Sequence, residues 1–448
     1  MDIESGVGFT PIGLSFLFLA SVLIFFLPRK YLTIPIFATA CYMTLGQKVI
    51  IFGFDFTLIR IVLLVCWSRL LIRKELFLFR PNINIIDKLF LCWVVASITT
   101  YTILYGTSNA FINRLGMAYN AIGTYFLFRY LIRDLSDINR VVKQLAIIIF
   151  PLAILMLFES LTGRNPFYSL GGVPEISAIR KGMVRCSGPF RAPHLAGTLG
   201  ATLMPLFVSM WFNLKVKKLI CVIGVIAATI ITITSSSSGP VMAYGFAAIG
   251  LIMVPFRRYM RAIRWGVVFM LISLYLIMKA PVWYLIMRLS NVIGGVGWHR
   301  SYLIDQFFKR FNEWWLIGAV KISHWMPYGH PIDPDKIDIT NQYIAQGVNG
   351  GLITMILFIS IIVYCFKGVG RAMKENQMQA FSVKITLWSM GAALFAHVMN
   401  FLSVSYFDQI NVFWFLLLAM ISSLGTNSRK VKLAKLRNLK GSSFVSII

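Results

Sequence analysis

The chain has 448 residues, of which 58% are hydrophobic and only 13% are charged, and its mean hydropathy is +0.76. Soluble domains carry about 25% charged residues, so this composition excludes a soluble protein and indicates a membrane protein. The net charge of +27 accompanies no basic domain of soluble size with interleaved aromatic residues, which excludes nucleic acid as a partner. We expect this charge to orient the chain and to contact anionic lipids.

Apolar runs of about 20 residues, the length that crosses a bilayer, recur from residue 11 almost to residue 424. We predict an all-α fold, a polytopic transmembrane helical bundle of about 12–14 spans. Residues 1–424 would form a single transmembrane domain, and residues 425–448 a basic cytoplasmic tail. The predicted spans cover residues 11–27, 31–45, 53–72, 85–105, 113–132, 141–160, 193–212, 218–236, 239–254, 265–281, 349–366, 380–400 and 408–424.

Positive charge in the connections predicts the orientation, because Lys and Arg in short loops stay in the cytoplasm. Basic connections alternate with nearly uncharged ones, such as residues 106–109 and 235–238. This alternation puts the C-terminal tail in the cytoplasm and, with about 13 spans, the N-terminus outside. The basic connections carry Arg69, Arg73, Lys74 and Arg80, then Arg129, Arg133, Arg140 and Lys143, then Lys215, Lys217 and Lys218, then Arg257, Arg258, Arg261 and Arg264, then Lys367, Arg371 and Lys374.

Two loops on the predicted external face, residues 161–192 and the large external loop 281–340, break this rule. Long loops cross the membrane largely regardless of charge, so the charge of the larger loop could be without function. The alternative is an external site for an anionic ligand, since the planar, permanently charged guanidinium group suits phosphate. The basic and histidine side chains of these loops are Arg164, Arg180, Lys181, Arg185 and Arg191, then Arg288, His299, Arg300, Lys309, Arg310, Lys321, His324 and His330.

The first motif covers residues 185–197, directly before an apolar span. One glycine and two prolines in it break any helix and would hold Arg185 and Arg191 in a bent segment at the external interface. His194 stands at the head of the span, where a histidine is either a packing residue or a base. A second motif, residues 235–240, breaks a helix at the outer end of a span; its hydroxyls could bind phosphate or sugar, or it could be a polar turn.

The third motif lies in and just after the large external loop. Apolar side chains recur at helical spacing over residues 303–315 and predict an amphipathic helix that lies on the membrane surface or packs against the bundle. The histidines lack the spacing of a zinc site and no cysteine joins them, so we predict no metal and no cofactor. The polar residues of this motif are His299, Arg300, His330, Asp338, Asn341 and Tyr343.

In this order, and at these predicted membrane ends, the motifs resemble the O-antigen ligase family, polytopic membrane proteins that include O-antigen and exopolysaccharide polymerases. The resemblance spans most of the chain. The matching residues are Arg185, Gly188, Pro193, Ala196 and Gly197, then Ser237, Gly239 and Pro240, then Arg300, and finally Asn341, Gln342, Tyr343, Gly347 and Gly351.

The resemblance implies a helical fold of the GT-C type in the bacterial inner membrane, with an active site on the periplasmic, or external, face. It implies a metal-independent glycosyltransferase that moves a glycan from an undecaprenyl diphosphate carrier to an acceptor hydroxyl. The implied partners are this lipid-linked glycan donor, a glycan or lipid A-core acceptor, the lipid bilayer, and polysaccharide synthesis and export proteins.

A lipid diphosphate is already a good leaving group, so arginines can stabilise its developing charge without a metal. We assign Arg185, Arg191 and Arg300 to diphosphate binding. His330 is the candidate base that deprotonates the acceptor, with Asp338 in reserve. Further substrate contacts are assigned to His194, Ser237, His299, Asn341 and Tyr343.

Two departures from the family pattern favour a polymerase over a ligase that uses lipid A-core. Ligases commonly carry Ser-Arg-Gly where this chain has Ser237, Ser238 and Gly239, and His-Asn where it has Thr340 and Asn341. The missing histidine leaves the identity of the base open.

A lipid-linked oligosaccharide flippase is the alternative of another class. Carriers tend to place ionisable groups inside spans and to repeat them in two halves. A scaffold for a synthesis complex is a third alternative, and it would tolerate substitution of the external arginines. The ionisable residues within or at the ends of spans, which do not recur at matched positions, are Asp55, Arg60, Arg114, Glu159, His397 and Asp408.

Overall fold

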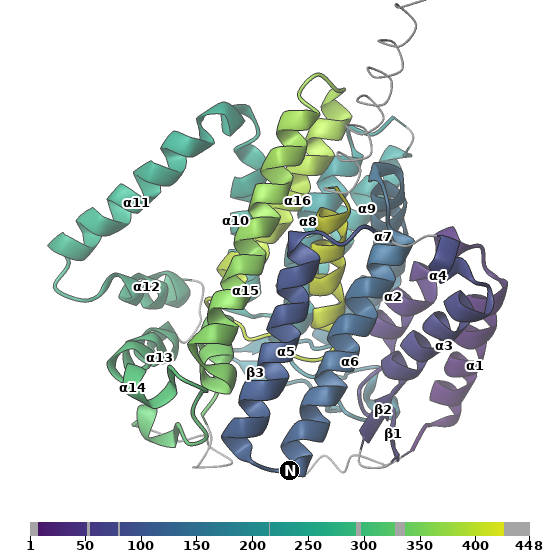
Figure 1. The fold of residues 1–448 in the computed structure, drawn as a ribbon, viewed down its shortest axis with the longest axis horizontal. Helices are drawn as coiled ribbons and strands as arrows, with labels where there is room; N and C mark the ends of the chain where they lie inside the picture. The colour runs from purple at the N-terminus through teal and green to yellow at the C-terminus, as the bar shows by residue number, and fades with distance from the viewer. Residues whose placement is uncertain are drawn as a thin grey trace, which may run out of the picture.

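The computed structural model of the chain describes residues 8–51, 54–78, 81–214, 216–292, 297–327 and 337–424. The protein is 74% helical with almost no sheet, which agrees with the predicted all-α class. Most of its long helices pack side by side into one bundle, whereas the helix Met260–Ile277 (α11) projects from its side and has no buried residue (Figure 1). In the described part of the chain, five helical stretches are long and apolar enough to cross a membrane: α5 (Ile85–Tyr105), α7 (Leu135–Thr162), Pro255–Ile277 with α11 (Met260–Ile277), α15 (Gln342–Glu375) and α16 (Phe381–Asn400).

Every predicted span lies on a helix, although several boundaries differ. Helix α2 has only 10 residues, about 15 Å at 1.5 Å per residue, which is half of a hydrocarbon core. The number of spans and their orientation therefore stay predictions. The other helices on which predicted spans lie are α1 (Pro11–Phe26), the short α2 (Thr33–Tyr42), α3 (Leu58–Ile72), α6 (Ser108–Leu131), α8 (Pro193–Met210), α9 (Lys218–Thr234), α10 (Ser238–Ile252) and Ile410–Leu424.

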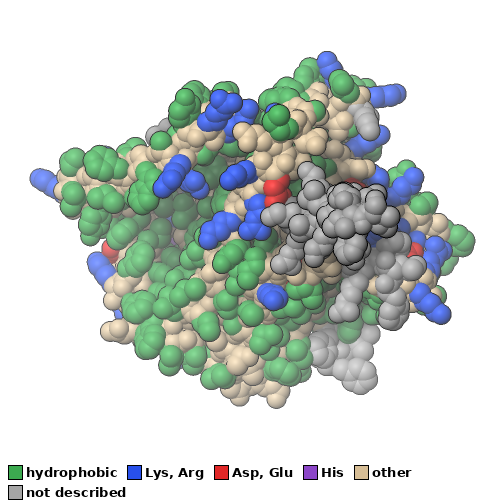
Figure 2. Space-filling view, turned by 45° about the horizontal axis from the view of Figure 1, so that its top comes forward, with side chains coloured by type: hydrophobic (Ala, Val, Ile, Leu, Met, Phe, Trp, Pro, Cys, Tyr) green, Lys and Arg blue, Asp and Glu red, His purple; other side chains and the backbone are tan. Residues whose placement is uncertain are grey.

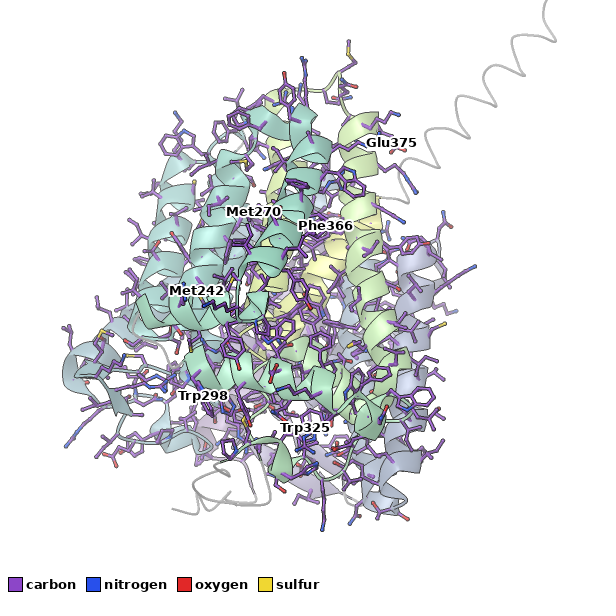
Figure 3. The ribbon with its side chains drawn as sticks, turned by 90° about the vertical axis from the view of Figure 1, so that its left-hand side faces the viewer. Met242, Met270, Trp298, Trp325, Phe366 and Glu375 are labelled. Atoms are coloured by element: carbon purple, nitrogen blue, oxygen red, sulfur yellow. The ribbon has the colours of Figure 1, made fainter. Side chains whose placement is uncertain are left out.

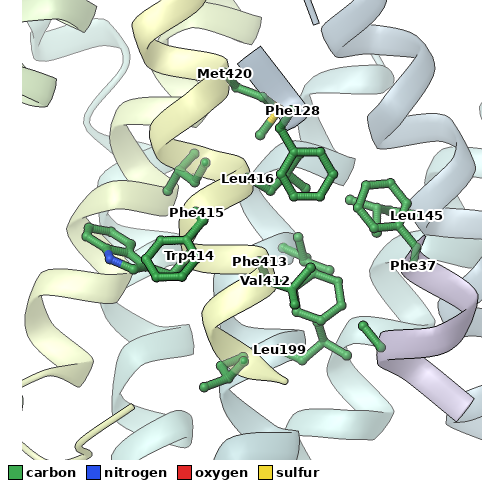
Figure 4. Close-up of a cluster of buried hydrophobic side chains, with 14 of the residues drawn as sticks. Phe37, Phe128, Leu145, Leu199, Val412, Phe413, Trp414, Phe415, Leu416 and Met420 are labelled. Carbon is green, nitrogen blue, oxygen red and sulfur yellow. The ribbon is translucent and has the colours of Figure 1, made fainter. Parts of the chain in front are cut away.

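The last helix, Ile410–Leu424, forms the centre of the bundle. Every side chain from Val412 to Leu424 is buried. Figure 4 shows Phe413 of this helix beside Phe37 of α2, and their rings stack with centroids 6.3 Å apart. Because lipid tails are as apolar as these side chains, close packing rather than exclusion from water holds such helices together.

The two ends of the bundle differ in character. Trp298 and Trp325 lie near one end, which we call the loop end, and Glu375 lies near the other (Figure 3). Figure 2 brings the latter end forward: Lys and Arg side chains are scattered over it, whereas apolar side chains cover much of the flanks. This distribution is the one expected of a bundle whose flanks face lipid.

Two small antiparallel ribbons are an addition to the predicted all-helical fold. Strands β1 (Lys48–Ile51) and β2 (Phe54–Thr57) pair with each other, so the helix of predicted span 53–72 begins only at Leu58. Strands β3 (Ile179–Arg180) and β4 (Met183–Val184) form the second ribbon, within loop 161–192.

The amphipathic run in the large external loop packs against α15, and its position relative to the membrane surface stays a prediction. It forms α13 (Gly297–Lys309) and α14 (Phe311–Trp314), after α12 (Leu285–Val292). The Phe307 and Trp314 rings stack with centroids 3.9 Å apart, and Trp314 is fully buried. A Cβ at Gly347 of α15 would lie 2.9 Å from the Phe307 ring, so glycine is needed for this close approach.

Helix α15 carries a kink at Gly351, whose φ of 71° is unfavourable for other residues. A Cβ there would meet the carbonyl oxygen of Leu316, in the segment after α14. The backbone amide of Leu352 donates to Trp315 O at 2.8 Å and thereby joins the loop to the kink.

We expect Gly351→Ala to destabilise the protein by at least about 1–2 kcal/mol, the cost of the left-handed conformation alone. The measurement is the midpoint of thermal unfolding in detergent. Gly370→Ala is the matched control, because that glycine lies in the same helix with no atom near its Cβ position, and we expect no loss there. An equal midpoint for both variants would contradict this account of the kink.

Candidate functional site

Arg185 and Arg300 converge on the turn that joins α9 to α10. Arg185 Nη2 donates to Ser237 Oγ at 3.0 Å, and Arg300 Nη1 donates to Ser238 Oγ at 3.1 Å. The two basic loops predicted from the sequence, 161–192 and 281–340, therefore meet at one place. Their meeting point is the serine turn that the sequence singled out as a possible ligand for phosphate or sugar.

Like charges are concentrated at this meeting point. Burial and the charges of the neighbouring Arg180 and Arg185 together lower the pKa of Arg300 to about 10, while Asp338 opposes them. Burial and Arg180 also lower the pKa of Arg185. Both groups nevertheless stay protonated at neutral pH. Grouped, partly desolvated cations destabilise one another, so an anion bound among them would be stabilised.

One donor of the Arg185 guanidinium group makes no hydrogen bond within the part of the protein that the structure describes. Within the described residues, Arg185 Nε is buried and has no hydrogen-bond partner. Arginine presents its donors in a rigid fork that matches two phosphate oxygens. We call Arg180, Arg185 and Arg300 the arginine cluster.

Local structure explains why Arg180 and Arg185 approach each other. They lie on the two sides of the β3–β4 ribbon, whose turn contains Lys181 with φ 51° and Gly182 with φ 74°. The backbone amide of Arg185 donates to Ala178 O at 2.9 Å, which continues the pairing of the ribbon.

Glu159, at the end of α7, anchors the segment that follows the ribbon. One of its carboxylate oxygens accepts bonds from Ser177 Oγ at 2.7 Å and from the Ser187 amide at 2.9 Å, and the other accepts from the Gly188 amide at 2.9 Å. The sequence identified Glu159 only as an ionisable residue within a span and gave it no role. The signal in the sequence that could have indicated a role for Glu159 was a carboxylate inside an apolar run.

His194 and His299 lie beside the arginine cluster. The His194 ring interacts electrostatically with three charged side chains, Arg185, Arg300 and Asp338. His299 Nε2 lies 2.8 Å from the backbone oxygen of Asp338 and so ties the start of α13 to the segment before α15. The structure thus places these residues around one site, as the sequence grouped them.

Other predicted site residues lie apart from the arginine cluster. Asn341 caps α15, because its Oδ1 accepts the amides of Tyr343 and Ile344 at 2.9 and 3.2 Å. Tyr343 Oη donates to Val398 O at 3.1 Å. These bonds use both polar groups within the fold, and a substrate contact for either stays a prediction. The candidate base His330 lies outside the described residues.

A cavity of about 720 Å³ has walls of both polar and apolar side chains. Its walls come from α3, α5, α6, the start of α15 and residues 405–412, and they include Arg191 and Asp338. Arg191 is therefore part of the cavity wall, near Asp408. Among the residues that the structure describes, no three His, Cys, Asp or Glu side chains come together as metal ligands.

Comparisons with known proteins add no assignment to these observations. No protein-family model matches the chain, and no curated protein matches its sequence.

Proposed function

We propose that the protein is a membrane glycosyltransferase that takes a glycan from an undecaprenyl diphosphate carrier and joins it to an acceptor hydroxyl. We place this reaction at the loop end, on the external face of the bacterial inner membrane, and propose that its product is a cell-surface polysaccharide. The single observation that supports this most is the convergence of Arg185 and Arg300 on the α9–α10 turn.

The chemistry follows from the charge of the donor. When the bond between the anomeric carbon and the diphosphate breaks, negative charge grows on the leaving oxygen. The fixed guanidinium groups of Arg185 and Arg300 stabilise that charge more than they stabilise the intact donor, which is the condition for catalysis. The acceptor oxygen forms the new bond, and its proton passes to a base on the protein. Asp338, which acts on Arg300, and His330 are the candidates from the sequence.

The apolar flanks of the bundle support the membrane setting. The basic residues of the alternating connections favour the cytoplasm, and Glu375 lies at the same end as the connection between α15 and α16, opposite Trp298 (Figure 3). The loop end would then be external, where lipid-linked glycans await transfer.

A reconstituted assay tests this function. Purified protein in liposomes receives an undecaprenyl diphosphate glycan as the only donor, with a chelator present. Lengthened lipid-linked glycan is the expected product and identifies a polymerase. Product that forms only when lipid A-core is supplied would identify a ligase. Movement of the lipid-linked glycan across the bilayer without any transfer would contradict the proposal and identify a flippase.

A further inference from the structure

The cavity of about 720 Å³ is not lined by Arg185 or Arg300, the residues to which the proposed function gives the donor, although Arg191 and Asp338 belong to its wall. Its volume of about 720 Å³ is within the range of small-molecule sites. Three of its wall residues are Arg60, Arg114 and Asp408, which come from α3, α6 and the turn before the last helix. Such a mixture of donors and acceptors suits a ligand with many hydroxyl groups.

Two buried side chains of the wall have polar atoms without partners among the described residues. Arg114 is 8% exposed and its Nε has no hydrogen bond, while Gln409 is 2% exposed and its Oε1 has none. Buried polar groups are nearly always hydrogen-bonded, and an unmet group is costly. Gln409 is held in place because its Nε2 donates to Met43 O at 2.9 Å and to Pro189 O at 3.1 Å. A bound glycan could supply what these atoms lack.

An aromatic face lies next to the same wall. The guanidinium carbon of Arg114 lies 3.6 Å from the centroid of the Tyr101 ring, which fixes the plane of the guanidinium group. In the same wall, Arg60 Nε donates to Asn120 Oδ1 at 3.0 Å. Both cations are therefore positioned before any ligand arrives, and such preorganisation favours binding.

Asp408 is the carboxylate of the wall that is best suited to accept a proton. Its φ of 59° is uncommon for a residue other than glycine, and its buried Oδ2 has no partner among the described residues. Burial raises the pKa of Asp408 to about 6, while Arg191 acts to lower it. A base with a pKa just below the working pH is mostly ionised and still accepts a proton well.

A ring contact and electrostatic interactions link the cavity wall to the arginine cluster, and we infer that a ligand in the cavity could reach the donor. Phe407, next to Asp408 in the chain, packs on His194 with ring centroids 5.9 Å apart. His194 in turn interacts electrostatically with Arg185 and Arg300. Asp338 is part of the cavity wall and also interacts electrostatically with Arg300.

We propose that this cavity binds the acceptor glycan and that Asp408, in place of the sequence candidates Asp338 and His330, is the base that deprotonates the attacking hydroxyl, an assignment that rests on the proposed transferase function. The acceptor oxygen bonds to the anomeric carbon of the donor sugar. The bond from that carbon to the diphosphate breaks, and its electron pair leaves with undecaprenyl diphosphate. The hydroxyl proton passes to the Asp408 carboxylate and then to water.

This assignment predicts a pH dependence. Asp408 is active as the carboxylate, so transfer should fall about tenfold per pH unit below about 6 and level off above it. Of the groups around it, Arg191 acts on its titration directly. The other charged groups of the cavity wall are Lys48, Asp55, Arg60, Arg114 and Asp338.

The test compares Asp408→Asn with wild type in the liposome assay, together with donor binding in detergent. We expect the transfer rate to fall about 100-fold or more, donor binding to stay unchanged, and the remaining activity to lose its dependence on pH near 6. Glu375→Gln is the matched control, because Glu375 is an exposed carboxylate at the opposite end of the molecule, and we expect the wild-type rate.

A second variant tests the cavity separately from the base. Arg114→Met keeps most of the side-chain volume but removes the charge, and we expect the KM for the acceptor to rise roughly tenfold with donor binding unchanged. Transfer by Asp408→Asn at the wild-type rate and pH profile, or an unchanged acceptor KM in Arg114→Met, would overturn this inference while the transferase function stood. Wild-type protein without transfer activity would overturn both.

Discussion

Arg300→Ala is expected to lower glycan transfer about 100- to 1,000-fold, the usual cost of removing one group that stabilises a leaving oxyanion. Arg300 is half-buried, and its bond to Ser238 holds it against the α9–α10 turn, so its charge is fixed where the diphosphate would sit. The initial rate in liposomes, at saturating acceptor, measures the effect. Arg185→Ala should have a loss of the same order, because its guanidinium group is held by the neighbouring Ser237.

Arg288→Ala is the control for this prediction. Arg288 is an exposed arginine of the same large loop, on α12, and its removal changes the net charge equally. We expect a rate within about twofold of wild type, since exposed charges are screened by salt. Arg300→Lys should fall between the two, because lysine keeps the charge and loses the fork. Equal rates in Arg300→Ala and Arg288→Ala would remove the arginine cluster from the mechanism.

The sequence predicted the helices, and it singled out the two basic loops, for physical reasons that operate locally. An apolar run of 15–20 residues can satisfy its backbone only as a helix in lipid, so each predicted span lies on a helix. Positive charge on the predicted external side was unusual enough to single out Arg185 and Arg300. Their contacts with Ser237 and Ser238 agree with the three motifs that the sequence grouped.

The parts that escaped prediction depend on contacts between distant residues. The central position of the helix Ile410–Leu424 cannot be read from its hydropathy, because lipid and protein interior are equally apolar. The cavity brings Arg60, Arg114 and Asp408 together from three separate elements, and each alone looked like an isolated ionisable residue. Polar groups inside apolar spans were the usable signal, but the sequence does not say which of them face one another.

The other large effect concerns the buried ion pair between Asp87 of α5 and Arg129 of α6, far in sequence from the candidate site. Arg129 Nε donates to Asp87 Oδ1 at 2.9 Å, and both side chains are at most 2% exposed. The same carboxylate oxygen accepts Tyr125 Oη at 2.6 Å and Ser422 Oγ at 2.9 Å. Asp87 therefore joins α5 and α6 to the central helix.

We expect Asp87→Ala to lower the free energy of unfolding by about 3–5 kcal/mol, because it leaves the Arg129 charge buried without its counter-ion. Asp137→Ala, which breaks a more exposed pair with Arg140, should cost only about 1 kcal/mol. Denaturation in detergent measures both. Replacing both partners, in Asp87→Ala with Arg129→Met, should recover part of the loss, since no charge is then stranded. A double variant less stable than either single variant would mean that Asp87 and Arg129 stabilise the bundle through separate contacts rather than through each other.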